Sequence, residues 1–179
     1  SLYTNNGNNN TAVGHEALEL NTTGASNVAV GRQSLEANTT ASNNTGVGYS
    51  ALAANTTGDM NVAAGSGALA SNDAGDRSVA IGHNALTTQN PPGNVDMYNV
   101  GIGLNAGFSV TTGVKNVLVG GLAGDAFNAA NENVAVGYQA LTQDLKGHRS
   151  VAIGTDSLGT QQFGTSTNVY NVGVGYNTG

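Results

Sequence analysis

Short apolar phrases return along this chain with turn-forming residues between them. A typical phrase is "VAVG" at residues 28–31, in which a large, a small and a large apolar residue precede a glycine. Alternation of this kind, with β-branched residues at the large positions, favours a short strand over a helix. Clusters of Asn, Gly and Thr, such as "NTTG" at residues 21–24, indicate turns. The pattern therefore predicts many very short strands joined by tight turns.

The glycine that closes each phrase serves as an anchor for a repeat. Successive anchors follow a 17-residue period, which is lengthened at two places to a 21-residue interval. The ten anchors are Gly14, Gly31, Gly48, Gly65, Gly82, Gly103, Gly120, Gly137, Gly154 and Gly175. Such a period is typical of a solenoid, because one repeat can bury its apolar residues only against the next. The chain is therefore predicted to be all-β, with a single repeat domain over residues 1–179. That domain is a parallel β-solenoid of about ten 17-residue coils, two of them extended to 21.

Each 17-residue unit is expected to hold two short strands and two turns. Because successive side chains of a strand point to opposite faces, we expect Val28 and Val30 to face a thin core and Ala29 to face outward. A small apolar column on the outside predicts close approach of another backbone, as in a symmetric homotrimer. The predicted interface column is Ala12, Ala29, Gly46, Ala63, Ala80, Gly101, Leu118, Ala135, Ala152 and Gly173. The alternative interpretation is that a small residue fits a tight bend.

Asparagine forms a second regular column. It lies four residues before the anchor in eight of the ten repeats, and Ser78 and Ser150 take that position in the other two. Stacked asparagines can form a ladder of amide hydrogen bonds along the axis of a stack. A simple turn residue is the other interpretation, and both can hold.

The two 21-residue coils interrupt the repeat in the same way. They read "TTQNPPGNVDMYNVGIG" at 87–103 and "GTQQFGTSTNVYNVGVG" at 159–175, and Tyr98 aligns with Tyr170. Insertions in a solenoid form loops on one face, often the binding face. The candidate partner contacts are Asn94, Asp96, Tyr98, Phe163 and Tyr170. The aromatic rings among them are candidate stacking surfaces for sugars. Alternatively, the two tyrosines cover the core where the coil widens.

Composition narrows the classes of function. Charged residues make up 9% of the chain and the net charge is −6 without a run of like charges, which argues against a nucleic-acid partner. The chain has no cysteine, which excludes disulfides and thiolate metal sites. No apolar run approaches the ~18 residues of a membrane-spanning helix, so we expect no membrane insertion by this segment.

Titratable residues are scattered over the columns of the repeat. An enzyme needs titratable groups that converge. His15 and His83 share a position with Tyr and Arg, which indicates a solvated surface. Asp73 and Asp76 lie in a turn that lacks the phrasing of a calcium-binding repeat. We therefore expect no catalytic residues, no cofactor and no metal site, and the chain is not predicted to be an enzyme.

The repeated phrases resemble those of a known group of fibrous proteins. "RSVAIG" at 77–82 and 149–154 resembles the "N-S-V-A-I-G" head repeat of trimeric autotransporter adhesins, and residues 10–24 resemble repeats of phage tail-fibre proteins. The resemblance covers the whole chain, although the adhesin repeat is shorter than the one found here. It implies a left-handed β-roll with three chains side by side. We expect this chain to be a fragment of such a longer fibrous protein.

The resemblance also implies a function and a location. The expected role is a structural or adhesive rod that presents or spaces a host-cell contact, with other copies of the chain and a cell-surface glycan or protein receptor as partners. The expected location is extracellular, on a virion tail fibre or a bacterial cell surface. Two alternatives remain. The recurring "NTT" suggests an ice-binding solenoid, although threonine becomes rarer after Asn72, and a carbohydrate-active β-helix would need converging carboxylates.

Overall fold

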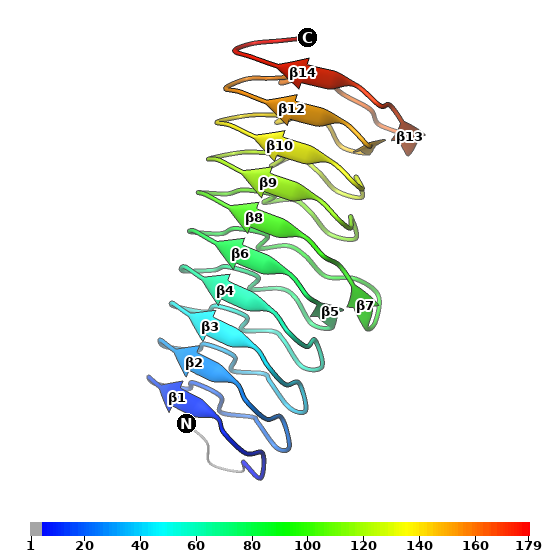
Figure 1. The fold of residues 1–179 in the computed structure, drawn as a ribbon. Coiled ribbons are helices and arrows are strands. Elements are labelled where there is room, and N and C mark those ends of the chain that lie inside the picture. The colour runs from blue at the N-terminus through cyan, green and yellow to red at the C-terminus, as the bar shows by residue number, and fades with distance from the viewer. Residues whose placement is uncertain (1–4) are drawn as a thin grey trace.

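The computed structural model describes residues 5–179 as one stack of coils without a helix (Figure 1). One three-residue strand from each coil joins a parallel ten-stranded sheet in the order β1-β2-β3-β4-β6-β8-β9-β10-β12-β14. These strands are β1 (Thr11–Val13), β2 (Val28–Val30), β3 (Thr45–Val47), β4 (Val62–Ala64), β6 (Val79–Ile81), β8 (Val100–Ile102), β9 (Val117–Val119), β10 (Val134–Val136), β12 (Val151–Ile153) and β14 (Val172–Val174). The predicted all-β parallel solenoid of about ten turns is confirmed.

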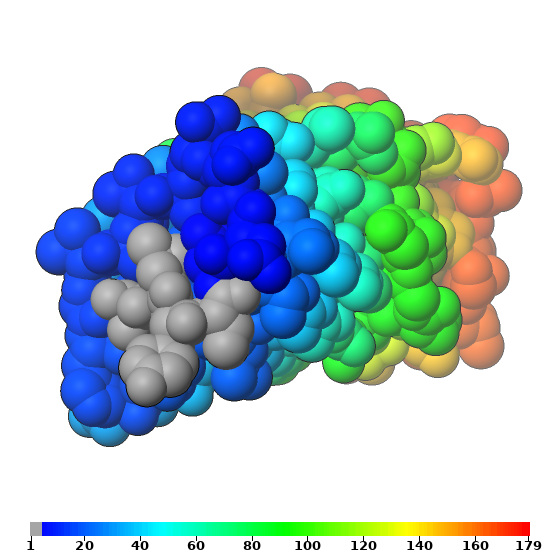
Figure 2. All heavy atoms as spheres, turned by 90° about the horizontal axis from the view of Figure 1, so that it is seen from below, coloured from blue at the N-terminus to red at the C-terminus, as the bar shows by residue number. Residues whose placement is uncertain are grey.

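The register of the sheet follows the repeat. Ala29 pairs with Ala12 on one side and with Gly46 on the other, so equivalent residues of successive coils lie side by side. The pairing passes through the longer coils unchanged, because Ala80 pairs with Gly101 and Ala152 with Gly173. The extra residues therefore leave the sheet as loops. Figure 2 looks along the stack from the N-terminal coil, with the later coils behind it.

Within residues 5–179, a second strand forms only beside the longer coils. There β5 (Gly75–Asp76) pairs with β7 (Val95–Asp96), and β11 (Gly147–His148) pairs with β13 (Thr167–Asn168). In the other coils the remaining residues are turns. Residues such as Glu16 and Leu18 have φ values of 60° and 49°, so the chain turns where a strand would need extended backbone. The prediction of two strands in every coil is therefore wrong.

The side chains of the sheet point in the opposite directions from those predicted. Ala29 is fully buried, whereas Val28 is half-buried and Val30 is 36% exposed. The predicted outward column in fact lines the interior, buried throughout except for half-buried Ala12: Ala12, Ala29, Gly46, Ala63, Ala80, Gly101, Leu118, Ala135, Ala152 and Gly173. These residues contact their own core, so their prediction as the oligomer interface is wrong.

A leucine column on the opposite wall explains this direction. Leu35 and Leu86, four residues after their anchors, are fully buried and point toward the sheet. A Cβ atom on Gly101 would lie 2.8 Å from Cγ of Leu86, and one on Gly46 would lie 3.4 Å from Cγ of Leu35. Because the leucines fill the narrow interior, the sheet can place only a small residue against them.

Two neighbouring coils fill the interior differently. At the leucine position they carry Gly107 and Gly124, and the space is taken by Leu118 from the sheet and by Val110 and Phe127 from the far turn, all fully buried. A Cβ atom on Gly124 would lie 2.8 Å from Cδ2 of Leu118 and 3.0 Å from Cδ2 of Phe127. Leu118 is the one large side chain in its column, and it fits because Gly107 and Gly124 replace the leucines on the opposite wall.

The predicted asparagine ladder is present inside the stack. The side-chain oxygen of Asn27 accepts a hydrogen bond from the backbone N–H of Asn44, 2.9 Å away, and Asn44 does the same for Asn61. The amide nitrogen of Asn44 donates across the coil to the carbonyl of Gly58 at 2.8 Å. These buried amides satisfy backbone groups that would otherwise lack partners, each at a net gain of about 1 kcal/mol.

A second amide ladder was not predicted. It passes through the "NTT" turns, where the side-chain nitrogen of Asn38 donates to Asn21 at 2.7 Å, and it continues through Asn55 and Asn72 to Gln89. All five residues are fully buried. Turn-forming composition hid their role, because asparagine is as common in solvated turns as in buried ladders.

Candidate functional site

The outer side of the ten-stranded sheet is a flat apolar surface. It consists of the residues one and three positions before each anchor, and we call it the apolar face. Its residues are Thr11, Val13, Val28, Val30, Thr45, Val47, Val62, Ala64, Val79, Ile81, Val100, Ile102, Val117, Val119, Val134, Val136, Val151, Ile153, Val172 and Val174. Inner members remain accessible, as the 41% exposure of both Val47 and Ile81 shows.

The apolar face is comparable in area to the largest apolar patches on monomeric proteins. Ten strands at ~4.8 Å spacing and about 10 Å in length cover roughly 450 Å² in projection. This falls within the roughly 300–600 Å² of the largest apolar patch on a typical monomer, and such patches often mark interaction sites. The face has twenty residues, which is the lower end of the ~20–30 per side found in standard protein interfaces.

Polar and aromatic side chains border the apolar face. The column directly after the anchors contains Arg32 and Tyr49, whose guanidinium and ring centroid lie 5.8 Å apart. The column five residues before the anchors contains Met60, Lys115 and Glu132 among others. An apolar centre without charge and a rim containing Tyr, Arg and Met is the composition of a protein–protein interface.

The first insertion brings two of the predicted contact residues together. The hydroxyl of Tyr98 donates to the carboxylate of Asp96 at 3.3 Å, and Arg77 of the preceding coil pairs with that carboxylate. The Arg77 guanidinium also lies 5.9 Å from the Tyr98 ring centroid. Asn94 lies exposed in the same loop. The side chain that enters the core here is Met97, which is fully buried.

The second insertion repeats this arrangement four coils further along. The guanidinium of Arg149 lies 5.7 Å from the ring centroid of Tyr170 and donates to its hydroxyl at 3.0 Å. Arg149 also donates to Glu132 at 2.7 Å, and this hydrogen bond lowers the pKa of Glu132. Phe163 is half-buried, and its backbone N–H donates to Asp144 at 3.1 Å.

The five predicted contact residues therefore lie at two separate places. The insertions that contain strands β7 and β13 project on the same side of the stack, as predicted (Figure 1). Tyr98 is 47% and Tyr170 62% exposed, so neither ring is buried in the core. The sequence did not reveal that each tyrosine packs on an arginine, because the insertion between them breaks the usual 17-residue period.

The acidic turn at residues 73–76 has a structural role in the stack. Asp73 accepts a hydrogen bond from the hydroxyl of Thr56, and the buried Asp76 accepts one from the backbone N–H of Asp59 at 2.7 Å. Burial raises the pKa of Asp76, although the Asp59 N–H and Arg77 act in the opposite direction. Asn131 takes the same column, and its side-chain oxygen accepts the N–H of Val114 at 2.8 Å. An uncharged amide at this position can therefore accept the same hydrogen bond from the preceding coil.

Replacing Asp76 with Asn should stabilise the fold at neutral pH. The pKa of Asp76 is raised in the folded protein, so protonation of its carboxyl stabilises the fold. This stabilisation is lost as the pH rises through the raised pKa. The Asp76→Asn variant keeps the hydrogen bond without the buried charge. We expect its Tm to exceed that of the parent by about 1–3 °C at pH 7, and the gain to vanish near pH 3. A constant difference at both pH values in calorimetry would contradict this interpretation.

Other candidate chemistry is sparse in residues 5–179. His15 and His83 are exposed in the column after the anchors. No group of three or more His, Asp or Glu side chains is arranged to hold a metal ion within that range. The same residues include no helix long and apolar enough to cross a membrane.

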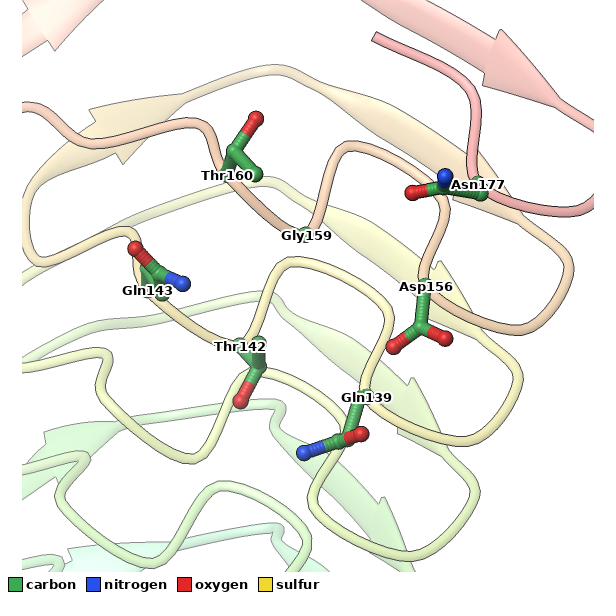
Figure 3. Close-up of a pocket in the computed structure, with 7 residues that line it drawn as sticks. All are labelled: Gln139, Thr142, Gln143, Asp156, Gly159, Thr160 and Asn177. Carbon is green, nitrogen blue, oxygen red and sulfur yellow. The ribbon is translucent and has the colours of Figure 1, made fainter.

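A polar depression lies near the C-terminal end of the stack, away from the apolar face. Its volume is about 230 Å³. It is lined by Gln139, Thr142, Gln143, Asp156, Gly159, Thr160 and Asn177. Figure 3 shows two rows of side chains from successive coils with Gly159 between them. These residues were not predicted as a site.

Comparison with known proteins identifies no relative of this chain. No family model, no curated protein and no solved structure matches this chain.

Proposed function

We propose that this chain is a structural and adhesive rod that spaces or presents a host-cell contact, as part of a phage tail fibre or a bacterial surface adhesin. The observation that carries the proposal is the apolar face, which continues over all ten coils of a regular stack. A stack of this kind offers length and repetition. The resemblance of its phrases to adhesin-head and tail-fibre repeats supports the same role and an extracellular location.

The proposed assembly is a homotrimer of left-handed β-rolls lying side by side, with the apolar face of each roll toward the common axis. Valine and isoleucine side chains on a flat sheet lose unfavourable contact with water when a second sheet covers them. An exposed, regular apolar sheet surface on a single chain would otherwise favour aggregation. The bordering columns, including the Arg32–Tyr49 pair, would then form the rim of each contact.

The insertion loops are the proposed contact with a protein receptor. They are the places where the regular surface of the stack is interrupted, and each presents an exposed tyrosine beside an arginine and a carboxylate. Tyrosine and arginine are the residue types enriched at the centres of binding interfaces.

Lysines on the apolar face should dissociate the assembly without unfolding the chain. We expect the parent to sediment with a mass near three chains and the Val47→Lys/Ile81→Lys variant to sediment as a monomer at the same concentration. Both side chains are partly exposed in the single chain, so lysine can reach water there, but a covered face would bury its charge. Circular dichroism should show the same β content in both.

A matched control adds the same charge elsewhere. Ala54 and Ser71 are exposed in turns away from the apolar face, so Ala54→Lys/Ser71→Lys should keep the mass of the parent. A parent that is monomeric at micromolar concentration would refute the proposed assembly.

A further inference from the structure

The polar depression is formed by equivalent positions of the last three coils. One wall is formed by Gln139, Asp156 and Asn177, each two residues after its anchor, so one side chain comes from each of three successive coils. Backbone hydrogen bonds of 2.9 Å hold the last two in place, from the N–H of Asp156 to Tyr138 and from the N–H of Asn177 to Thr155. The wall therefore runs along the axis of the stack (Figure 3).

The hollow itself arises at one glycine. Gly159 lies five residues after its anchor, and the eight preceding coils carry a side chain there, for example Ala53, Phe108 and Thr142. Gly159 is buried, and a Cβ atom on it would lie 3.1 Å from the carbonyl oxygen of Asp156. A side chain at this position would occupy the depression.

Several hydrogen-bonding groups in the depression have no partner within the chain. Among residues 5–179, the side chains of Gln139, Gln143, Asp156 and Asn177 form no hydrogen bond with another protein group. The two threonines are engaged: Thr142 donates to Asp125 at 2.5 Å, and Thr160 donates to the carbonyl of Gly179 at 3.1 Å. Three amides and one carboxylate are therefore available to a ligand.

The chemistry of these groups selects the class of ligand. No cationic side chain lines the depression and Asp156 is an acid, so an anionic ligand is disfavoured. One carboxylate is too few for a calcium site, which needs six to eight oxygen ligands. Amides supply both donors and acceptors, and a carboxylate accepts two hydrogen bonds or more, which suits the vicinal hydroxyls of a sugar.

The spacing of the wall suits a chain of sugars. Successive coils rise by ~4.8 Å, which is close to the length of one pyranose ring in a linear glycan. Gln139, Asp156 and Asn177 can thus meet about one ring each. The volume of about 230 Å³ is below the ~300–1,000 Å³ of most ligand pockets, so the open depression holds one or two rings.

We propose that the polar depression around Gly159 binds a linear, uncharged glycan lying along the axis of the stack. This inference rests on the proposed adhesive function, for which it names a contact surface and a ligand class. The site lies on the turns of the last three coils and includes Gly159 and Thr160 at the start of the second 21-residue coil. Its lining includes neither the predicted contact residues Phe163 and Tyr170 nor any residue of the apolar face.

The test uses oligosaccharides of known length on the 179-residue chain. Glucose oligomers with β-1,4 or α-1,4 linkages and N-acetylglucosamine oligomers, each from one to four rings, are titrated while amide NMR spectra are recorded. We expect at least one series to shift the amides of residues 139–143 and 156–160. Affinity should rise from one ring to two or three and then level off, with single rings binding at about millimolar concentration.

Two variants and a matched control locate the site. Gly159→Thr fills the hollow and Asp156→Ala removes its carboxylate. Each variant should weaken binding at least tenfold, because hydrogen bonds to a charged group are blocked or lost. Ala53→Thr makes the equivalent change in another coil and should bind as the parent does. Melting curves establish that all three variants are folded.

Each outcome supports or overturns the proposal. No shift with any of the three series, shifts that map elsewhere, or tighter binding of a uronic-acid oligomer of equal length would overturn it. These results are independent of the assembly, because the titration measures direct contact with the chain. A trimer without glycan shifts refutes this site alone, and glycan shifts on a monomer refute the proposed assembly alone.

Discussion

Replacing the anchor Gly48 with alanine should destabilise the chain by about 3–5 kcal/mol, the largest loss that we expect from one methyl group. Gly48 has a φ of +137°, which L-residues rarely adopt. A Cβ atom there would also lie 2.6 Å from the carbonyl oxygen and 2.7 Å from the carbonyl carbon of Gly65 in the next coil. Backbone atoms of a paired coil cannot move aside without breaking the stack. Urea denaturation followed by circular dichroism measures the loss.

Two other glycines separate the causes of this loss. Gly175 has a similar φ of +125°, but its Cβ atom would meet only Cγ2 of Thr178 at 3.3 Å, so Gly175→Ala should show the strain without the clash. Gly164 has neither a positive φ nor an atom within 4 Å of the added Cβ, and Gly164→Ala should change stability by under ~0.5 kcal/mol. Equal losses at Gly48 and Gly175 would show that contact between coils is not the larger cause.

Truncating Leu118 to alanine should cost about 3–5 kcal/mol. Leu118 is fully buried, and the leucines that other coils place across the core are replaced here by Gly107 and Gly124. Neither glycine can fill the resulting cavity. For a protein of this size the loss corresponds to a fall in Tm of roughly 6–20 °C. Leu145→Ala is the control, because Leu145 is 37% exposed and its truncation leaves no enclosed cavity.

A double-mutant cycle tests whether Leu118 is essential because Gly124 leaves the space opposite it unfilled. Gly124→Leu alone should destabilise by about 1–3 kcal/mol through overpacking against Leu118 and Phe127. The backbone accepts leucine there, since Gly124 has a φ of +55° and Leu141 at the same position has one of +53°. In the Leu118→Ala/Gly124→Leu variant the two losses should offset each other by at least about 1 kcal/mol. Additive losses would mean that the two positions do not share one space.

Much of the fold could be read from individual columns of the repeat. The anchor glycines were recognised from their spacing, and each occupies a backbone conformation and a close approach that exclude a side chain, as at Gly48. The asparagines before the strands were recognised from their regularity, and Asn44 and Asn61 form the ladder expected of them. Position along the chain was enough in these cases, because a repeat in register places equivalent residues above one another.

The candidate sites were less accessible to such reasoning. Tyr98 and Tyr170 were identified, but their arginine partners were not, because the insertions alter the usual distance along the chain. The depression around Gly159 has only one signal in the sequence, a glycine where eight coils have a side chain. Its significance depends on Gln139 and Asn177, which belong to other coils and approach it only in the stack.

Period, parallel pairing and coil number follow from the repeated phrases, since a 17-residue unit that cannot bury its own apolar residues must stack on its neighbours. The direction of the side chains required the packed structure. A phrase such as Val28-Ala29-Val30 alternates equally well with either face inward, so its pattern alone leaves the choice open. Leu35, held in a left-handed turn with a φ of 51°, fills the interior from the opposite wall and admits only the alanine. That packing turns the valines outward and creates the apolar face.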